Sequence, residues 1–138
     1  MELNRNQQHF IVMTAVYNVL NDVELGRKED YRNFEELISN LCEMPYEQVP
    51  SYIKATASYS INKYDEIVNA FAPKLKNWKW QRIPALCRAI LVMSYAHFYY
   101  VEKVDKKVVI DVAVNLAKKY LDNSQAHFIN AILDEVLN

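Results

Sequence analysis

The sequence predicts an all-helical protein, on the strength of three observations. Gly26 is the only glycine among 138 residues, and the hairpin pairs Asn-Gly and Asp-Gly are absent, which disfavours a β-rich fold. Apolar residues make up 51% of the chain and recur at the helical spacings of three and four. The scarcity of glycine also excludes Rossmann and P-loop nucleotide sites, which need several positions without a Cβ.

Three helices are expected in the N-terminal part of the chain. The first covers about 4–20, and the second covers about 30–41 and ends before Met44-Pro45. The third starts near Pro50 and continues until Pro73 stops it. The apolar stripe of the first helix consists of Phe10, Met13, Val16, Tyr17 and Leu20.

The C-terminal part contains the most apolar segment. Residues from about 83 to 100 are apolar on every side, which predicts the central helix of a bundle. An amphipathic helix follows at about 106–121. The last helix begins at Asn123 or Ser124, either of which is a good N-cap.

The chain is expected to form one domain, 1–138, with an N-terminal half at about 1–73 and a C-terminal half at about 74–138. It contains no linker long enough to separate two domains and no internal repeat. No run of about 18 apolar residues and no signal-peptide pattern occur, so we expect a cytoplasmic protein without membrane contact. Cys42 and Cys87 have no CxxC spacing and are expected to be reduced packing residues.

Candidate catalytic groups are few. His9, His97 and His127 fall on three different predicted helices, and neither a GxSxG nor an HExxH motif is present. Cys87 and His97 are separated by about 15 Å of helical rise, which is too far to share a proton. We therefore expect no enzyme activity, no metal site and no cofactor, and we expect His97 to be a partly buried, hydrogen-bonded imidazole.

The positive charge is concentrated in one block. Residues 74–119 carry 10 Lys and Arg against 3 Asp and Glu, although the net charge of the chain is −1. Such a block indicates either a face for an anionic partner or an ordinary solvated surface. Within it, Trp78 and Trp80 alternate with Lys76, Lys79 and Arg82. This mixture favours an RNA or protein-partner surface, and the alternative is that both indoles fill the seam between the two halves.

Four sequence blocks carry a family resemblance. They are residues 77–83 (NWKWQRI), 88–91 (RAIL), 107–120 (KVVIDVAVNLAKKY) and 128–134 (FINAILD), with Ala15-Val-Tyr17 in the first helix. Their order and spacing resemble the NusB family of transcription antitermination factors. The resemblance implies a compact bundle of about six to seven helices in two three-helix subdomains.

The resemblance also implies a non-enzymatic adaptor. Such an adaptor binds boxA-like single-stranded RNA together with a small-subunit ribosomal protein that acts as NusE, and through them acts indirectly on the RNA polymerase elongation complex. The RNA-binding candidates are Arg5, Gln7, His9, Lys107 and Lys118. The partner-binding candidates are Trp78, Trp80, Arg82, His127 and Asn130.

The chain departs from the family where RNA is expected to bind. The family's first helix opens with several arginines, of which only Arg5 is present, and each missing cation removes a counterion-release contribution to affinity. One alternative is therefore a divergent NusB-like protein–protein interaction module that has lost RNA binding. Another is the detached helical domain of a ribosomal RNA methyltransferase, because such enzymes carry a similar domain.

Overall fold

The computed structural model describes residues 2–26 and 31–138, and every regular element within these ranges is helical. This confirms the all-helical prediction. The α-helices are α1 (Arg5–Glu24), α2 (Tyr31–Cys42), α3 (Ser51–Asn62), α4 (Tyr64–Phe71), α5 (Ala85–Ala96), α6 (Lys106–Tyr120) and α7 (Asn123–Val136). The 3-10 turns are η1 (Tyr46–Gln48), η2 (Ala72–Lys74) and η3 (Trp80–Arg82), and the π-helical turn η4 (His97–Val101) extends α5. No helix of the described ranges is long and apolar enough to cross a bilayer.

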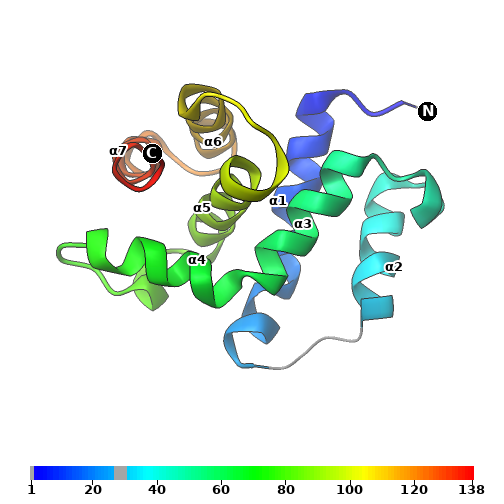
Figure 1. The fold of residues 1–138 in the computed structure, drawn as a ribbon, viewed down its shortest axis with the longest axis horizontal. Helices are drawn as coiled ribbons and strands as arrows, with labels where there is room; N and C mark the ends of the chain where they lie inside the picture. Colours follow the sequence, from blue (N-terminus) through cyan, green and yellow to red (C-terminus); the bar gives the residue numbers. More distant parts are fainter. Residues whose placement is uncertain (1, 27–30) are drawn as a thin grey trace.

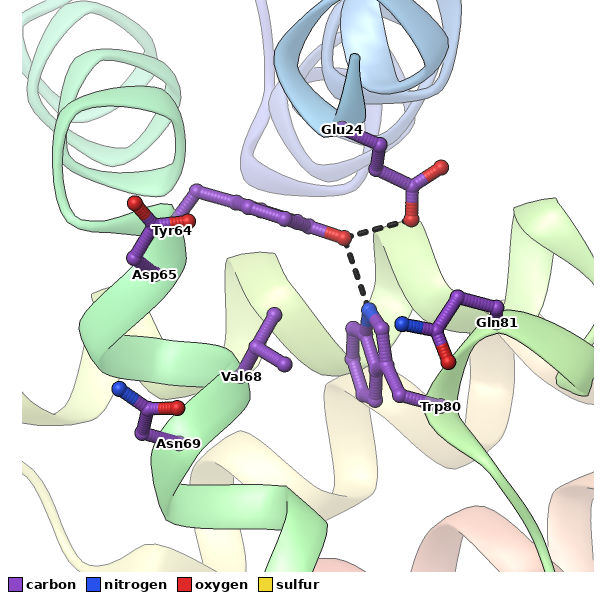
Figure 2. Close-up of a pocket in the computed structure, with 7 residues that line it drawn as sticks. All are labelled: Glu24, Tyr64, Asp65, Val68, Asn69, Trp80 and Gln81. Carbon is purple, nitrogen blue, oxygen red and sulfur yellow. Dashed lines mark hydrogen bonds between the residues drawn. The ribbon is translucent and has the colours of Figure 1, made fainter. Parts of the chain in front are cut away.

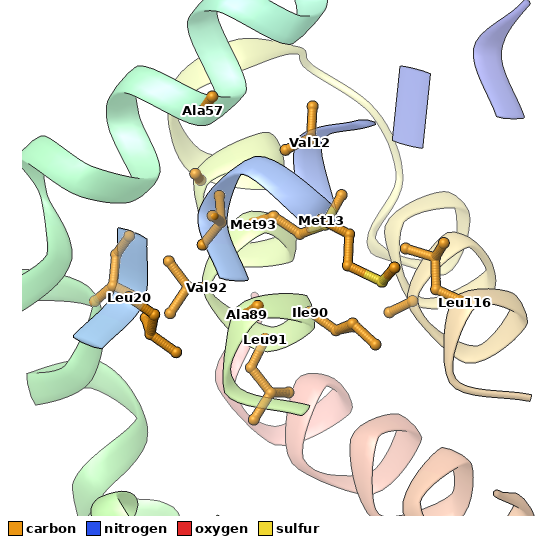
Figure 3. Packing of buried hydrophobic residues seen from close by; sticks show 14 of the residues in the cluster. Val12, Met13, Leu20, Ala57, Ala89, Ile90, Leu91, Val92, Met93 and Leu116 are labelled. Carbon is orange, nitrogen blue, oxygen red and sulfur yellow. The ribbon is translucent and has the colours of Figure 1, made fainter. Parts of the chain in front are cut away.

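Helix α5 forms the centre of the bundle, as its apolar sequence predicts. Residues 89–94 are all buried, so the helix is covered on every side. Helices α1, α3, α4, α6 and α7 all contact it (Figure 1). Figure 3 shows side chains of α1, α3 and α6 meeting those of α5, among them Met13, Ala57 and Leu116. One apolar cluster therefore includes residues from both halves of the chain.

Helix α1 packs against α2, α3 and α5, and its buried side chains form a wide face. Met13, Val16 and Leu20 of the predicted stripe are buried, but Phe10 and Tyr17 are 40% and 46% exposed. The prediction that these two rings face inward is wrong. The neighbouring helices cover only part of the apolar surface of α1, and the two rings, two turns apart, lie on one side of α1 at the edge of its buried face.

The predicted continuous helix from Pro50 to Pro73 is also wrong, because α3 ends at Asn62 and α4 begins at Tyr64, with Lys63 between them. Lys63 has φ −105° and ψ 17°, which interrupts the helix and changes its direction (Figure 1). The new direction packs α4 against α5 and α7 and buries Tyr64 and Phe71. A straight helix of this length would extend about 33 Å, beyond the packing surface of the core.

The start of α7 differs by one residue from the prediction. Asp122, rather than Asn123 or Ser124, is the N-cap, and its Oδ1 accepts a hydrogen bond of 2.8 Å from the backbone N–H of Gln125. The carboxylate satisfies a free backbone donor and places a negative charge at the positive end of the helix dipole.

Candidate nucleic-acid and partner interface

The first turn of α1 is closed by a reciprocal cap. Asn4 Oδ1 accepts a hydrogen bond from the N–H of Gln7, and Gln7 Oε1 accepts one from the N–H of Asn4, both 2.8 Å long. Gln7 is exposed, as an RNA-binding residue must be, but its carbonyl oxygen is engaged in the cap. Only its amide N–H groups remain for an outside ligand.

Arg5 is held against the loop that follows η4. Its Nη1 donates to Glu102 Oε1 at 2.8 Å, and its guanidinium lies 4.2 Å from the centre of the Tyr52 ring. The side chain keeps 49% of its surface exposed, so it remains open to solvent on one side. The one arginine expected to contact RNA therefore already has a carboxylate and an aromatic partner within the protein.

His9 does not face an RNA ligand, contrary to the sequence-based expectation. The side chain is buried, and its ring meets the edge of Tyr52 with the ring centres 5.5 Å apart. Burial, with smaller contributions from His97 and Arg5, lowers the pKa of His9 to about 4. The imidazole is therefore neutral at pH 7 and provides no cation to a phosphate.

His97 is buried and contacts the buried Tyr52 and the half-buried Glu102. Its Nδ1 lies 3.4 Å from Tyr52 Oη, and its Nε2 lies 3.0 Å from Glu102 Oε1. Burial lowers the pKa of His97, and the opposing effect of Glu102 does not reverse this. The expectation of a hydrogen-bonded imidazole is confirmed, but the side chain is buried rather than partly buried. Tyr52 and Glu102 were missed by sequence reasoning because they come from α3 and from a loop, with no motif that links them to α1.

An exposed aromatic and basic surface lies where α1 meets the end of α6. We call Phe10, Lys119 and Tyr120 the α1–α6 face. The rings of Phe10 and Tyr120 are in contact, with centres 5.2 Å apart, and Lys119 Nζ lies 5.4 Å from the centre of the Tyr120 ring. Lys118 is also exposed, but it lies two residues before Tyr120 and therefore on another side of α6. The α1–α6 face combines rings that can stack on bases with a cation that can bind a phosphate.

Lys107 is exposed but does not join the α1–α6 face directly. It lies eleven residues before Lys118 on α6, on the same side of the helix and about 16 Å away along its axis. A ligand that contacts both lysines must therefore extend along three turns of α6.

Trp80 is buried, so the expectation that it contacts a partner is wrong. It is 4% exposed and stacks on Phe71, with ring centres 5.5 Å apart. Its indole N–H donates to Tyr64 Oη at 2.7 Å, and the Tyr64 hydroxyl donates to Glu24 Oε2 at 2.6 Å (Figure 2). The alternative prediction, an indole that fills the seam between the two halves, is correct for Trp80. It is wrong for Trp78, which is 58% exposed.

The remaining partner candidates occupy two separate segments. Arg82 is exposed in the turn that precedes α5, whereas His127 and Asn130 are exposed on α7. His127 and Asn130 are three residues apart and share one side of that helix. His127 and Asn130 therefore share a surface on α7, whereas Arg82 and Trp78 both lie in the segment between α4 and α5.

A cavity of about 440 Å³ lies between the end of α1, the start of α4 and η3. Its lining includes Glu24, Tyr64, Asp65 and Trp80 (Figure 2). Glu24 Oε1 also accepts a hydrogen bond from Arg88 Nη2 at 3.0 Å. The carboxylate of Glu24 therefore binds both the Arg88 guanidinium and the Tyr64 hydroxyl. These contacts connect α1, α4 and α5. Within the described ranges, no three His, Cys, Asp or Glu side chains are grouped to hold a metal ion.

Comparison with known proteins agrees with the fold and with the sequence blocks. A sequence model of the NusB family matches residues 9–138. The chain belongs to the NusB family. The transcription antitermination protein NusB of Finegoldia magna is 31% identical over 98% of this chain and 94% of its own length. The NusB protein of Macrococcus caseolyticus is 36% identical over 56% of this chain and 58% of its own length.

The NusB fold is present as well. A solved structure of T. maritima NusB superposes with a TM-score of 0.74 and covers 99% of this chain and 92% of its own, at 21% identity. The curated NusB relatives are transcription antitermination proteins, a family without catalytic activity. The expectations of a NusB-like bundle and of a non-enzymatic factor are therefore confirmed.

Proposed function

We propose that this protein acts in transcription antitermination as an adaptor that binds boxA-like single-stranded RNA through the α1–α6 face. The observation that supports this proposal most strongly is the contact between the exposed Phe10 ring and the half-buried Tyr120 ring, with Lys119 beside it. The Phe10 ring keeps 40% of its surface exposed beside Tyr120, and a base that stacks on such a ring contributes about 1–3 kcal/mol to binding.

Stacking compensates for the small number of cations. His9 is neutral and Arg5 is paired with Glu102, so Lys119 next to the rings and Lys118 on the adjoining side of α6 are the cations without an ion pair to a described residue. With two or three phosphate contacts, the slope of log affinity against log salt should be shallow, roughly −1.5 to −2 on single-stranded RNA. Binding by the protein alone is therefore weak and depends on its aromatic residues.

A protein partner supplies the remaining affinity in this proposal. The partner is a small-subunit ribosomal protein that acts as NusE, and the complex acts indirectly on the RNA polymerase elongation complex. His127 and Asn130 on α7 are the proposed partner contacts, because both are exposed on one side of the helix. Joining a second RNA-binding protein to this one raises affinity through effective concentration, without a new contact on the α1–α6 face.

Fluorescence anisotropy of a labelled boxA-like RNA tests the proposal. The RNA is titrated with this protein alone, with the ribosomal protein alone and with both. We expect weak binding by this protein alone and tighter binding by the pair than by either component. If the two proteins associate but this protein adds nothing to RNA affinity, the function is that of a protein–protein interaction module without RNA binding, and the proposal is wrong.

A further inference from the structure

The segment between α4 and α5 contains a second surface with cations and an exposed ring. We call residues 74–82 the basic connector. No acidic residue occurs from position 67 to position 101 of the sequence. The four cations of the basic connector are exposed, and no carboxylate in the described part of the chain forms an ion pair with them. They are Lys74, Lys76, Lys79 and Arg82.

Trp78 is the most exposed ring on this surface, with 58% of its area accessible. Its neighbour Trp80 is anchored by Phe71 and Tyr64, so the connector is fixed at one end while Trp78 stays outside. Arg88 adds a second anchor by donating to the backbone carbonyls of Gln81 and Ile83. The indole and its flanking lysines are thereby held on a supported segment, which reduces the entropy lost when a ligand binds.

We propose that the basic connector is a second binding site for single-stranded nucleic acid, with a base stacked on Trp78 and phosphates bound by the four cations. Cations that alternate with an exposed ring match the alternation of phosphates and bases in a single strand. The proposal rests on the proposed RNA-binding function and adds to it a separate place on the molecule. Figure 1 shows the segment between α4 and α5 at the end of the molecule that lies away from the N-terminus and the first turn of α1.

The intrinsic fluorescence of the two tryptophans provides a local test. Trp78 is exposed and Trp80 is buried, so a base that stacks in the basic connector should quench mainly the emission of Trp78. An oligouridine of about ten nucleotides is the probe. We expect quenching in the natural protein and its loss in Trp78→Phe, which keeps the buried Trp80. Quenching that persists in Trp78→Phe would overturn the proposal.

The salt dependence tests the cations independently. The double variant Lys76→Gln and Lys79→Gln removes two cations from the basic connector. The slope of log affinity for oligouridine against log salt concentration should then become less steep by about 1.4. The charge-matched control exchanges Lys54→Gln and Lys63→Gln, which lie on α3 and at its end, and should leave the slope unchanged. An equal slope in the connector variant and in the natural protein would contradict the proposal. Polyglutamate is an anionic chain without bases, so stronger quenching of Trp78 by polyglutamate than by oligouridine would contradict it as well.

Failure of this inference can be separated from failure of the proposed function. The α1–α6 face is tested by Phe10→Ala, which leaves both tryptophans in place. Quenching of Trp78 that survives in Phe10→Ala supports a separate site in the basic connector, whatever happens to overall affinity. Quenching that disappears in Phe10→Ala would show that Trp78 reports on the α1–α6 face, and it would contradict a second site.

Discussion

Arg5 and Glu102 are 97 positions apart in the chain, yet Arg5 Nη1 lies 2.8 Å from Glu102 Oε1. The same oxygen lies 3.0 Å from His97 Nε2. One carboxylate thus joins the first turn of α1 to the end of the central helix. The ion pair also competes with any phosphate for Arg5, because a guanidinium that contacts RNA must leave Glu102 or share it.

Glu102→Gln should therefore strengthen RNA binding at low salt. The exchange keeps the size of the side chain and removes the charge that holds Arg5, so one more cation is available to a phosphate. We expect the log–log salt slope to become steeper by about 0.7, measured by fluorescence anisotropy. Glu66→Gln is the control for losing a carboxylate away from Arg5, because Glu66 accepts a hydrogen bond from Tyr100 and lies 4.0 Å from Lys63, which is not among the RNA-binding candidates. No change in slope for Glu102→Gln would exclude Arg5 from the RNA-binding surface.

The burial of His9 predicts a loss of stability in mild acid. Its pKa is lowered from 6.5 to about 4 in the folded protein, mainly by burial, so the unfolded chain binds the proton first as pH falls. Stability is complete above about pH 6.5 and decreases until about pH 4, by roughly 3 kcal/mol in total for this group. Burial lowers the pKa of His97 too, which acts in the same direction.

Urea unfolding at several pH values measures this effect. His9→Gln should flatten the decrease in unfolding free energy between pH 6.5 and pH 4, whereas the exposed His127→Gln should leave it as in the natural protein. Identical pH profiles for His9→Gln and the natural protein would mean that His9 titrates as an exposed histidine does.

Ile90→Asp should destabilise the protein severely. Ile90 is fully buried in α5, and the exchange leaves an unpaired carboxylate in an apolar interior. We expect a loss of more than about 4 kcal/mol, visible as an unfolded or aggregated product by circular dichroism. Val108→Asp on α6 is the control, because Val108 is half exposed and should tolerate the charge. A cooperatively folded Ile90→Asp protein of ordinary stability would contradict the central position of α5.

The sequence predicted the parts of this structure that depend on local pattern. The apolar run of α5 is covered on every side because the other helices surround it, and periodicity alone indicates this. Trp78 and Trp80 show the limit of such reasoning. They lie two residues apart in the same basic segment, but only Trp80 meets Phe71 and Tyr64, and those contacts depend on the break at Lys63.

The candidate site shows the same limit. Phe10 looks like a core residue by its spacing but is 40% exposed, because it lies at the edge of the buried face of α1, against Tyr120 at the end of α6. His9 looks like a surface residue by its polar neighbours and is buried, because Tyr52 and His97 approach it from two other elements. Both errors arise from the rotation of α1 about its axis. Tertiary packing sets that rotation, and the apolar residues of α1 are too evenly distributed to reveal it.

The most direct test of the account is the RNA affinity of Phe10→Ala compared with Tyr59→Ala. Both exchanges remove an aromatic ring that is about 40% exposed, but Tyr59 stacks on Tyr100 rather than on Tyr120. Fluorescence anisotropy with boxA-like RNA should show an affinity about tenfold lower for Phe10→Ala, the loss of one stacked base, and no change for Tyr59→Ala. Equal affinities for the two folded variants would contradict RNA binding at the α1–α6 face.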